Sequence, residues 1–244
     1  MRRRSRAFAL AGVFAALAAP ATGVVPAADR IAGAIAEHNR ESGRARRIGL
    51  DVALVGASGG VEATGQLWSD PRGFARLELL RPDGARERFL MRGGRFGASR
   101  DGERMPSPPA LLPPLFLLQV DTESALRAAL LALGGDPNQA VLGHTEREDC
   151  YVLGGRDIPD RASEPPRDRV AFWVDQETFE AVAIHLEDGV RFHLGPTEDH
   201  AGLRVPAWID IDGPGRERLR LEIRAAEPVD AAPGAFDPSW LRSR

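Results

Sequence analysis

Two close pairs of carboxylates are the side chains best suited to acid–base chemistry. Glu187 and Asp188 are adjacent, and Asp210 and Asp212 are two residues apart. Paired carboxyl groups are the machinery of glycoside hydrolysis. The first pair, however, falls at an expected turn and the second on the charged face of an expected strand, where solvated carboxylates need no catalytic explanation. We therefore expect no catalytic residues, and a hydrolase is the disfavoured alternative.

Histidine and cysteine could bind a metal or act in nucleophilic catalysis. The five histidines are His38, His144, His185, His193 and His200. They show no His-x-x-x-His spacing and no paired cysteines accompany them, as a zinc site would require. We expect them on solvated faces, and we expect no metal and no cofactor. The single cysteine, Cys150, lies in an apolar segment, which predicts a buried, inert thiol without an internal disulfide.

Alternating apolar and polar residues predict strands over most of the chain. Residues 48–54 alternate with a period of two, which is typical of a half-buried strand. The same period continues in residues 61–68, 74–79 and 85–91. Short turns such as Pro82-Asp83-Gly84 favour antiparallel neighbours. The stretch from 170 to 224 repeats the pattern, with residues 203–211 expected as one strand, after a charged, proline-rich loop at 158–169.

Two helices are expected to accompany this sheet. Residues 28–40 place Ile31 and Ile35 on one face of an amphipathic helix. A stretch with five prolines, residues 105–114, then interrupts the strands, and residues 124–133 form an apolar helix that ends before Gly134. We interpret residues 111–133 as a candidate lid. The fold class is α+β, mainly β: a curved antiparallel sheet wrapped around helices.

Residues 1–27 have the pattern of an export signal. Four arginines (Arg2, Arg3, Arg4 and Arg6) precede an apolar stretch over residues 8–19, and positions 25 and 27 offer a cleavage site. The alternative is an uncleaved membrane anchor, for which the apolar stretch is short. No cysteine lies at the cleavage point, so we expect residues 28–244 to form a single soluble, periplasmic domain without a lipid anchor.

The charge balance argues against one class of partner. The net charge is −3, and all 32 basic residues are arginine. Loss of the leader with its arginines makes the remainder more acidic. Such a protein is poorly suited to bind nucleic acid or anionic lipid surfaces. We expect a monomer that has no nucleic-acid partner.

Several short motifs follow one another in a characteristic order. Gly65-Gln66-Leu67-Trp68 runs into a turn with Pro71, a hairpin turn follows at Pro82-Asp83, and the second half contains Phe172-Trp173-Val174-Asp175. In this order they resemble the periplasmic lipoprotein-carrier superfamily, the LolA/LolB-like proteins. One residue departs from the family: its shuttle proteins carry a basic residue before the proline that helps to hold the lid shut, and this chain has Asp70 there.

The resemblance implies an incomplete β-barrel that holds acyl chains in an apolar cup. The residues expected to line the cup and its lid are Trp68, Leu77, Leu79, Phe89, Leu115, Phe116 and Leu118. The chain would then be a periplasmic, non-enzymatic carrier or sensor that binds the acyl chains of a lipoprotein or lipid. An inner-membrane donor and an outer-membrane acceptor are its implied partners.

Two alternatives stay open at the level of sequence. The apolar residues could pack a solid core instead of lining a cup, and the same fold could serve an envelope scaffold or regulatory protein that binds a protein partner. The substitution Leu77→Glu is expected to weaken lipid binding while the fold is retained.

Overall fold

The computed structural model describes residues 25–107, 109–145, 148–155, 170–215, 217–230 and 234–243. Residues 1–24 of the expected export signal and the whole loop expected at 158–169 lie outside these ranges. None of the helices within the ranges is both long enough and apolar enough to span a membrane.

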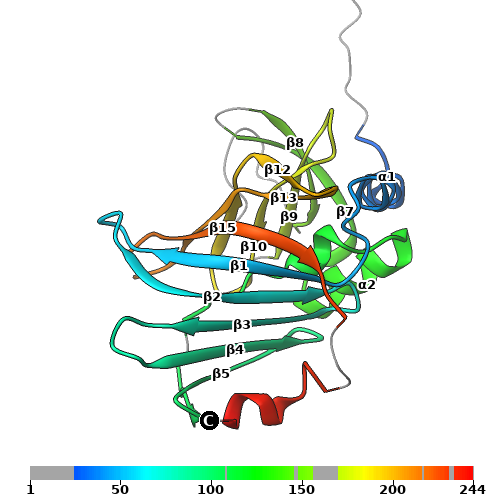
Figure 1. Cartoon of the computed structure of the whole chain (residues 1–244). Coiled ribbons are helices and arrows are strands. Elements are labelled where there is room, and N and C mark those ends of the chain that lie inside the picture. Colours follow the sequence, from blue (N-terminus) through cyan, green and yellow to red (C-terminus); the bar gives the residue numbers. More distant parts are fainter. Residues whose placement is uncertain are drawn as a thin grey trace, which may run out of the picture.

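Thirteen of the described strands form one antiparallel sheet (Figure 1). The first six are β1 (Ile48–Val55), β2 (Val61–Asp70), β3 (Phe74–Leu80), β4 (Arg86–Arg92), β5 (Arg95–Arg100) and β6 (Glu103–Arg104). The others are β7 (Asp136–His144), β8 (Asp149–Gly154), β9 (Ala171–Asp175), β10 (Ala181–His185), β11 (Arg191–Leu194), β14 (Trp208–Asp212) and β15 (Leu219–Pro228). The spatial order is β6-β5-β4-β3-β2-β1-β15-β14-β11-β10-β9-β8-β7, so β6 and β7 are the two edges of a curved sheet. This confirms the expected fold class.

The strand expected over residues 203–211 is divided in two. β13 (Leu203–Pro206) pairs with β12 (Thr197–His200) in a separate hairpin, and β14 begins at Trp208 in the main sheet. Pro206 has no amide hydrogen to donate to a ladder, so a strand ends readily there. The expectation of one continuous strand was wrong for this reason.

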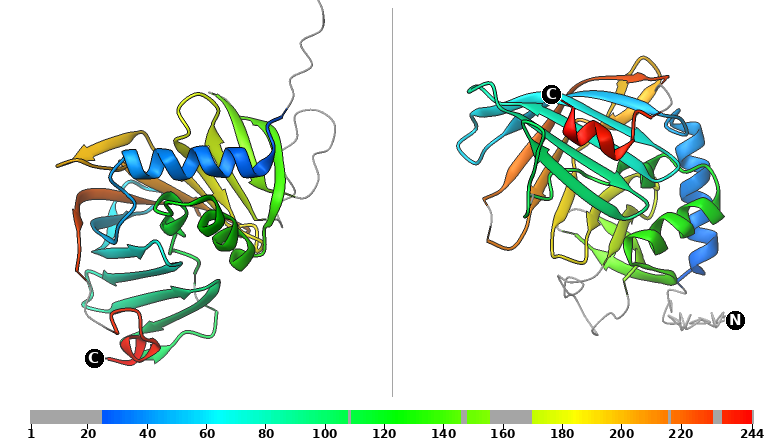
Figure 2. Two further views of the ribbon diagram at one scale, coloured as in Figure 1. Left: turned by 90° about the vertical axis from the view of Figure 1, so that its right-hand side faces the viewer. Right: turned by 90° about the horizontal axis from the view of Figure 1, so that it is seen from below.

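Both expected helices are present, and they lie next to each other on the same side of the sheet (Figure 2). α1 (Ala28–Glu41) buries Ile31 and Ile35. α2 (Glu123–Leu133) begins after Thr122, whose hydroxyl accepts a hydrogen bond from the Ala125 amide at 3.2 Å. It ends at Gly134, whose φ of 99° is a left-handed conformation that favours glycine.

Two 3₁₀ helices lie on opposite faces of the sheet. η1 (Leu115–Leu118) contacts β2, β3 and α2 on the same side as the two α-helices, and we call this side the inner face. η2 (Pro238–Arg242) contacts β4, β5 and β6 from the other side, the outer face. The main apolar core lies on the inner face and includes residues from both halves of the sheet.

Candidate ligand-binding cup

Six of the seven residues expected to line the cup and its lid come together on the inner face. Leu77 and Leu79 of β3 and Phe89 of β4 point to this side, because Leu77 and Phe89 are register partners and share a pleat. Leu115, Phe116 and Leu118 meet them from η1. All six belong to one apolar cluster, and their exposed fractions range from 0 to 4 %.

Trp68 lies on the outer face, away from the other six. Its neighbour Leu67 points inward toward the core, so the period of two turns Trp68 outward. There the guanidinium of Arg76 lies 3.7 Å from the centroid of the indole ring. The placement of Trp68 in the cup is therefore corrected: it supports the outer face through a cation–π contact.

A single chain segment covers the inner face opposite β2 and β3. Residues 111–120, which we call the covering segment, supply seven apolar side chains that are each at most 4 % exposed: Leu111, Leu112, Leu115, Phe116, Leu117, Leu118 and Val120. A ligand that used this face would have to displace them. Leu77 is 0 % exposed in this core, so the carboxylate of Leu77→Glu would be buried among apolar side chains and is expected to destabilise the fold as well as to weaken lipid binding.

The covering segment has few polar attachments, and they lie at its C-terminal end. The Gln119 side chain accepts a hydrogen bond from the Ser69 hydroxyl at 2.6 Å and donates one to the Arg46 carbonyl at 3.0 Å. Asn39 of α1 donates to the carbonyls of Leu117 at 3.3 Å and Val120 at 3.0 Å. We call Asn39, Ser69 and Gln119 the polar clasp. Because all three are buried, their bonds must be broken before the segment can move.

Asp70 follows Ser69 directly but holds a different part of the molecule. Its buried carboxylate accepts hydrogen bonds from Arg47 Nε at 2.8 Å and Arg72 Nε at 2.9 Å. Burial would raise the pKa of Asp70, but the hydrogen bonds from Arg72 and Arg47 outweigh it and lower the pKa to about 2. Asp70 thus joins β2 to the link before β1, and the neighbouring clasp holds the covering segment.

The groups considered for catalysis are dispersed. Asp210 is buried and paired with Arg218 and Arg220, not solvated as expected, because Arg220 of β15 and Arg218 just before this strand lie beside β14. Glu187 and Asp188 occupy the turn after β10, as expected. Among the described residues no three His, Cys, Asp or Glu side chains are arranged to hold a metal ion.

Two titratable side chains are buried at the opposite end of the sheet from η2. Cys150 is buried and free, as expected, and burial, with added repulsion from Glu148, raises the pKa of its thiol to about 12, which disfavours the reactive thiolate. His185 is also buried, and this desolvation, helped by the charge of Arg191, lowers its pKa to about 3. Its expected place on a solvated face was wrong because Trp173 packs against its ring.

Residues 56–60 read Gly-Ala-Ser-Gly-Gly and match the Gly-x-Ser-x-Gly spacing of a hydrolase nucleophile. That motif functions at a tight turn from a strand into a helix. Here it forms the turn of the β1–β2 hairpin instead, and Ser58 is exposed. In the described part of the chain its hydroxyl has no hydrogen bond to a histidine, so the match carries no nucleophile.

Solved structures show what this architecture is similar to. An outer membrane lipoprotein-sorting protein domain from Vibrio parahaemolyticus matches with a TM-score of 0.51 and 10 % identity, covering 88 % of this chain and 100 % of that one. A DUF1329 family protein from Desulfovibrio piger gives a TM-score of 0.49 at 12 % identity, covering 88 % and 100 %. A LolA superfamily protein from Nitrosomonas europaea gives 0.44 at 13 % identity, covering 84 % and 97 %.

At the level of sequence, neither a family model nor a curated protein matches the chain. The comparison with the lipoprotein-sorting domain confirms the expected resemblance in fold. The chain therefore shares the fold of that domain: a curved, open antiparallel sheet with helices on its inner face.

Proposed function

We propose that this chain is a periplasmic, non-enzymatic carrier or sensor that holds the acyl chains of a lipoprotein or lipid on its inner face. One observation carries the proposal: a continuous apolar face is covered by a separate apolar segment, residues 111–120, that has few polar attachments. The lipoprotein-sorting domain with the same fold supports it. No cofactor or metal has a part in it.

The proposed mechanism is the exchange of one apolar partner for another. An acyl chain gains about 0.8 kcal/mol for each methylene that it buries, so a long chain offsets the exposure of the leucines that it displaces. Breaking the polar clasp costs about 1 kcal/mol for each hydrogen bond. The covering segment would therefore act as a lid, loading from an inner-membrane donor and releasing to an outer-membrane acceptor with higher affinity.

Lipid extraction and mass spectrometry on protein purified from the periplasm test the proposal, together with displacement of a fluorescent fatty acid. A stoichiometric acyl lipid that is displaced competitively is the expected result. Protein that carries no lipid and displaces nothing would contradict the carrier and favour a scaffold that binds a protein partner.

The chain offers a matched pair of variants for this titration. Leu77 and Leu80 lie on the same strand, but Leu77 is 0 % exposed on the inner face and Leu80 is 49 % exposed. Leu77→Ala is expected to weaken fatty-acid binding, whereas Leu80→Ala leaves it unchanged. Circular dichroism on both variants verifies that the fold is retained, and equal binding by the two would remove Leu77 from the ligand site.

A further inference from the structure

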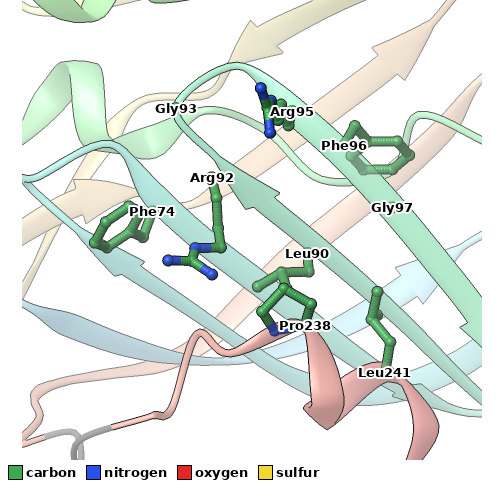
Figure 3. A pocket seen from close by; sticks show the side chains of 9 residues that line it. All are labelled: Phe74, Leu90, Arg92, Gly93, Arg95, Phe96, Gly97, Pro238 and Leu241. Atoms are coloured by element: carbon green, nitrogen blue, oxygen red, sulfur yellow. The ribbon is translucent and has the colours of Figure 1, made fainter.

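A pocket of about 520 Å³ lies on the outer face, on the far side of the sheet from the cup. The ends of β3, β4 and β5 form its floor and η2 forms one wall (Figure 3). Its volume falls within the range of roughly 300–1,000 Å³ that is usual for small-molecule sites. Nothing in the proposed carrier function uses this pocket.

The floor and the wall of the pocket are apolar. Leu90 of β4 and Phe74 of β3 lie on the floor, and Leu241 of η2 faces them across the pocket (Figure 3). Gly97 of β5 keeps the space open, because a Cβ at this position would lie only 3.3 Å from Leu241 Cδ1. The pocket can therefore take the apolar body of a small ligand.

Two arginines place positive charge at the rim of this otherwise apolar pocket. Arg92 and Arg95 are direct register partners across the β4–β5 hairpin, and both are exposed. Like charges that face each other across a ladder repel and destabilise the pair. Among the described residues neither forms an ion pair, whereas Arg88, on the same strand and the same face, is held by Glu78 at 2.8 Å.

One acidic residue lies close enough to compete for Arg92. Asp237 precedes η2, and its carboxylate accepts a hydrogen bond from the Ser239 amide at 2.8 Å. That bond, and to a smaller extent the charge of Arg92, lowers the pKa of Asp237. Asp237 is engaged as the cap of η2 and makes no ion pair with Arg92 in the described chain. The Arg92 guanidinium lies 5.5 Å from the centroid of the Phe74 ring, a cation–π contact that holds it at the pocket without neutralising its charge, so both guanidinium groups can bind an added anion.

We propose that this pocket is a second ligand site, which takes a small amphipathic anion. Arg92 and Arg95 would bind a carboxylate or phosphate head through charge-assisted hydrogen bonds. A short alkyl body would lie on Leu90 and against Leu241. A free fatty acid and the head of an anionic membrane lipid share this chemistry, and the site requires no opening of the covering segment.

Titration of the full chain with decanoate, followed by NMR of leucine methyl groups, tests the site. Decanoate is expected to shift the Leu90 and Leu241 methyl signals, and Arg92→Gln or Arg95→Gln to weaken this binding about tenfold. Arg104→Gln, at an exposed position of β6, is the matched control and leaves the affinity unchanged. Decanol, which has the same chain without the charge, shifts neither signal.

Two further experiments distinguish a free fatty acid from a membrane lipid as the source of the anion, and distinguish binding in this pocket from binding in the cup. If vesicles of phosphatidylglycerol bind wild type but not the Arg92→Gln/Arg95→Gln variant, the ligand is the head of a membrane lipid. If the protein binds decanoate but not the vesicles, the ligand is a free fatty acid. Gly97→Val, which fills the pocket, is expected to abolish both vesicle binding and decanoate binding at this site. Shifts confined to Leu77 and Leu115 would overturn this site while supporting the cup, and equal affinity in the double variant would overturn it as well.

Discussion

Asp70 ends β2 as a buried carboxylate that accepts hydrogen bonds from Arg47 and Arg72. Its pKa is lowered to about 2 in the folded protein, whereas an aspartate in an unfolded chain titrates near 3.9. The ionised form therefore stabilises the fold by about 2 kcal/mol above pH ~4, and this contribution is lost as the pH falls through about 2. Asp70→Asn is expected to lower the free energy of unfolding by about that amount at pH 7, measured with urea.

The pH dependence distinguishes charge from packing at this position. The difference between wild type and Asp70→Asn should narrow as the pH falls from about 4 to about 2, because the Asp70 carboxyl of the unfolded chain takes up a proton in this range while that of the folded protein is still ionised. Asp51→Asn serves as the control. Asp51 is the exposed residue of β1, so this substitution should change the free energy of unfolding by less than about 0.5 kcal/mol. A loss that stays constant from pH 7 to pH 3 would mean that the amide simply packs badly.

Single residues also mark where sequence reasoning succeeds and where it does not. The period of two assigns Leu77 and Leu79 to one face, and the structure places them there. The same rule turns Trp68 away from Leu67, but the motif resemblance took precedence in assigning it to the cup. The burial of Asp210 was not predictable, because it depends on Arg220 of β15 and Arg218 just before it, and the pairing of β15 with β14 is a tertiary property.

The covering segment is the element whose movement the proposed function requires. Gln119→Ala removes the hydrogen bonds to Ser69 and Arg46, and the loss of buried partners costs the closed form about 1–3 kcal/mol. If the open form binds acyl chains, its larger population lowers the apparent Kd for a fluorescent fatty acid, by about tenfold for each 1.4 kcal/mol. Stopped-flow measurements should show faster association as well.

Gln66→Ala is the matched control for this variant. Gln66 lies on β2, the strand of Ser69, but it is exposed, and in the described part of the chain its side chain donates a hydrogen bond only to the Asp51 carboxylate at 3.2 Å, so the Kd and the association rate should not change. If Gln119→Ala loses stability and yet binds fatty acid as slowly and weakly as wild type, the clasp does not control access to the inner face.

Elements with a strong local pattern were predicted closely. The helices expected at 28–40 and 124–133 are Ala28–Glu41 and Glu123–Leu133, because their apolar spacing, the Thr122 cap and the Gly134 stop are local signals. The division of residues 203–211 was missed, since the pairing of β13 with β12 instead of the main sheet depends on contacts outside the segment. The β1–β15 pairing, between residues far apart in the sequence, was equally beyond a local pattern.

At the scale of the whole molecule, one sheet separates two different surfaces. Its inner face is apolar and filled by the chain itself, and its outer face near η2 combines arginines with aromatic rings, as where Arg76 lies over both Trp68 and Trp240. The C-terminal residues 234–243 are held on this outer face by Arg76 and Arg88, which donate to the carbonyls of Ala235 and Trp240. A ligand on one face therefore leaves the other free.

Whether the inner face is a carrier's cup or a solid core can be decided by removing one side chain. Phe116 is buried at the centre of the covering segment. The substitution Phe116→Ala leaves a cavity there and is expected to lower the free energy of unfolding by about 3–5 kcal/mol. Leu131→Ala, at a position 63 % exposed on α2, should cost far less. An acyl chain that enters the cup fills part of that cavity, so saturating fatty acid should raise the melting temperature of Phe116→Ala more than that of wild type. A variant that is destabilised and gains nothing from fatty acid would show that residues 111–120 only complete a core.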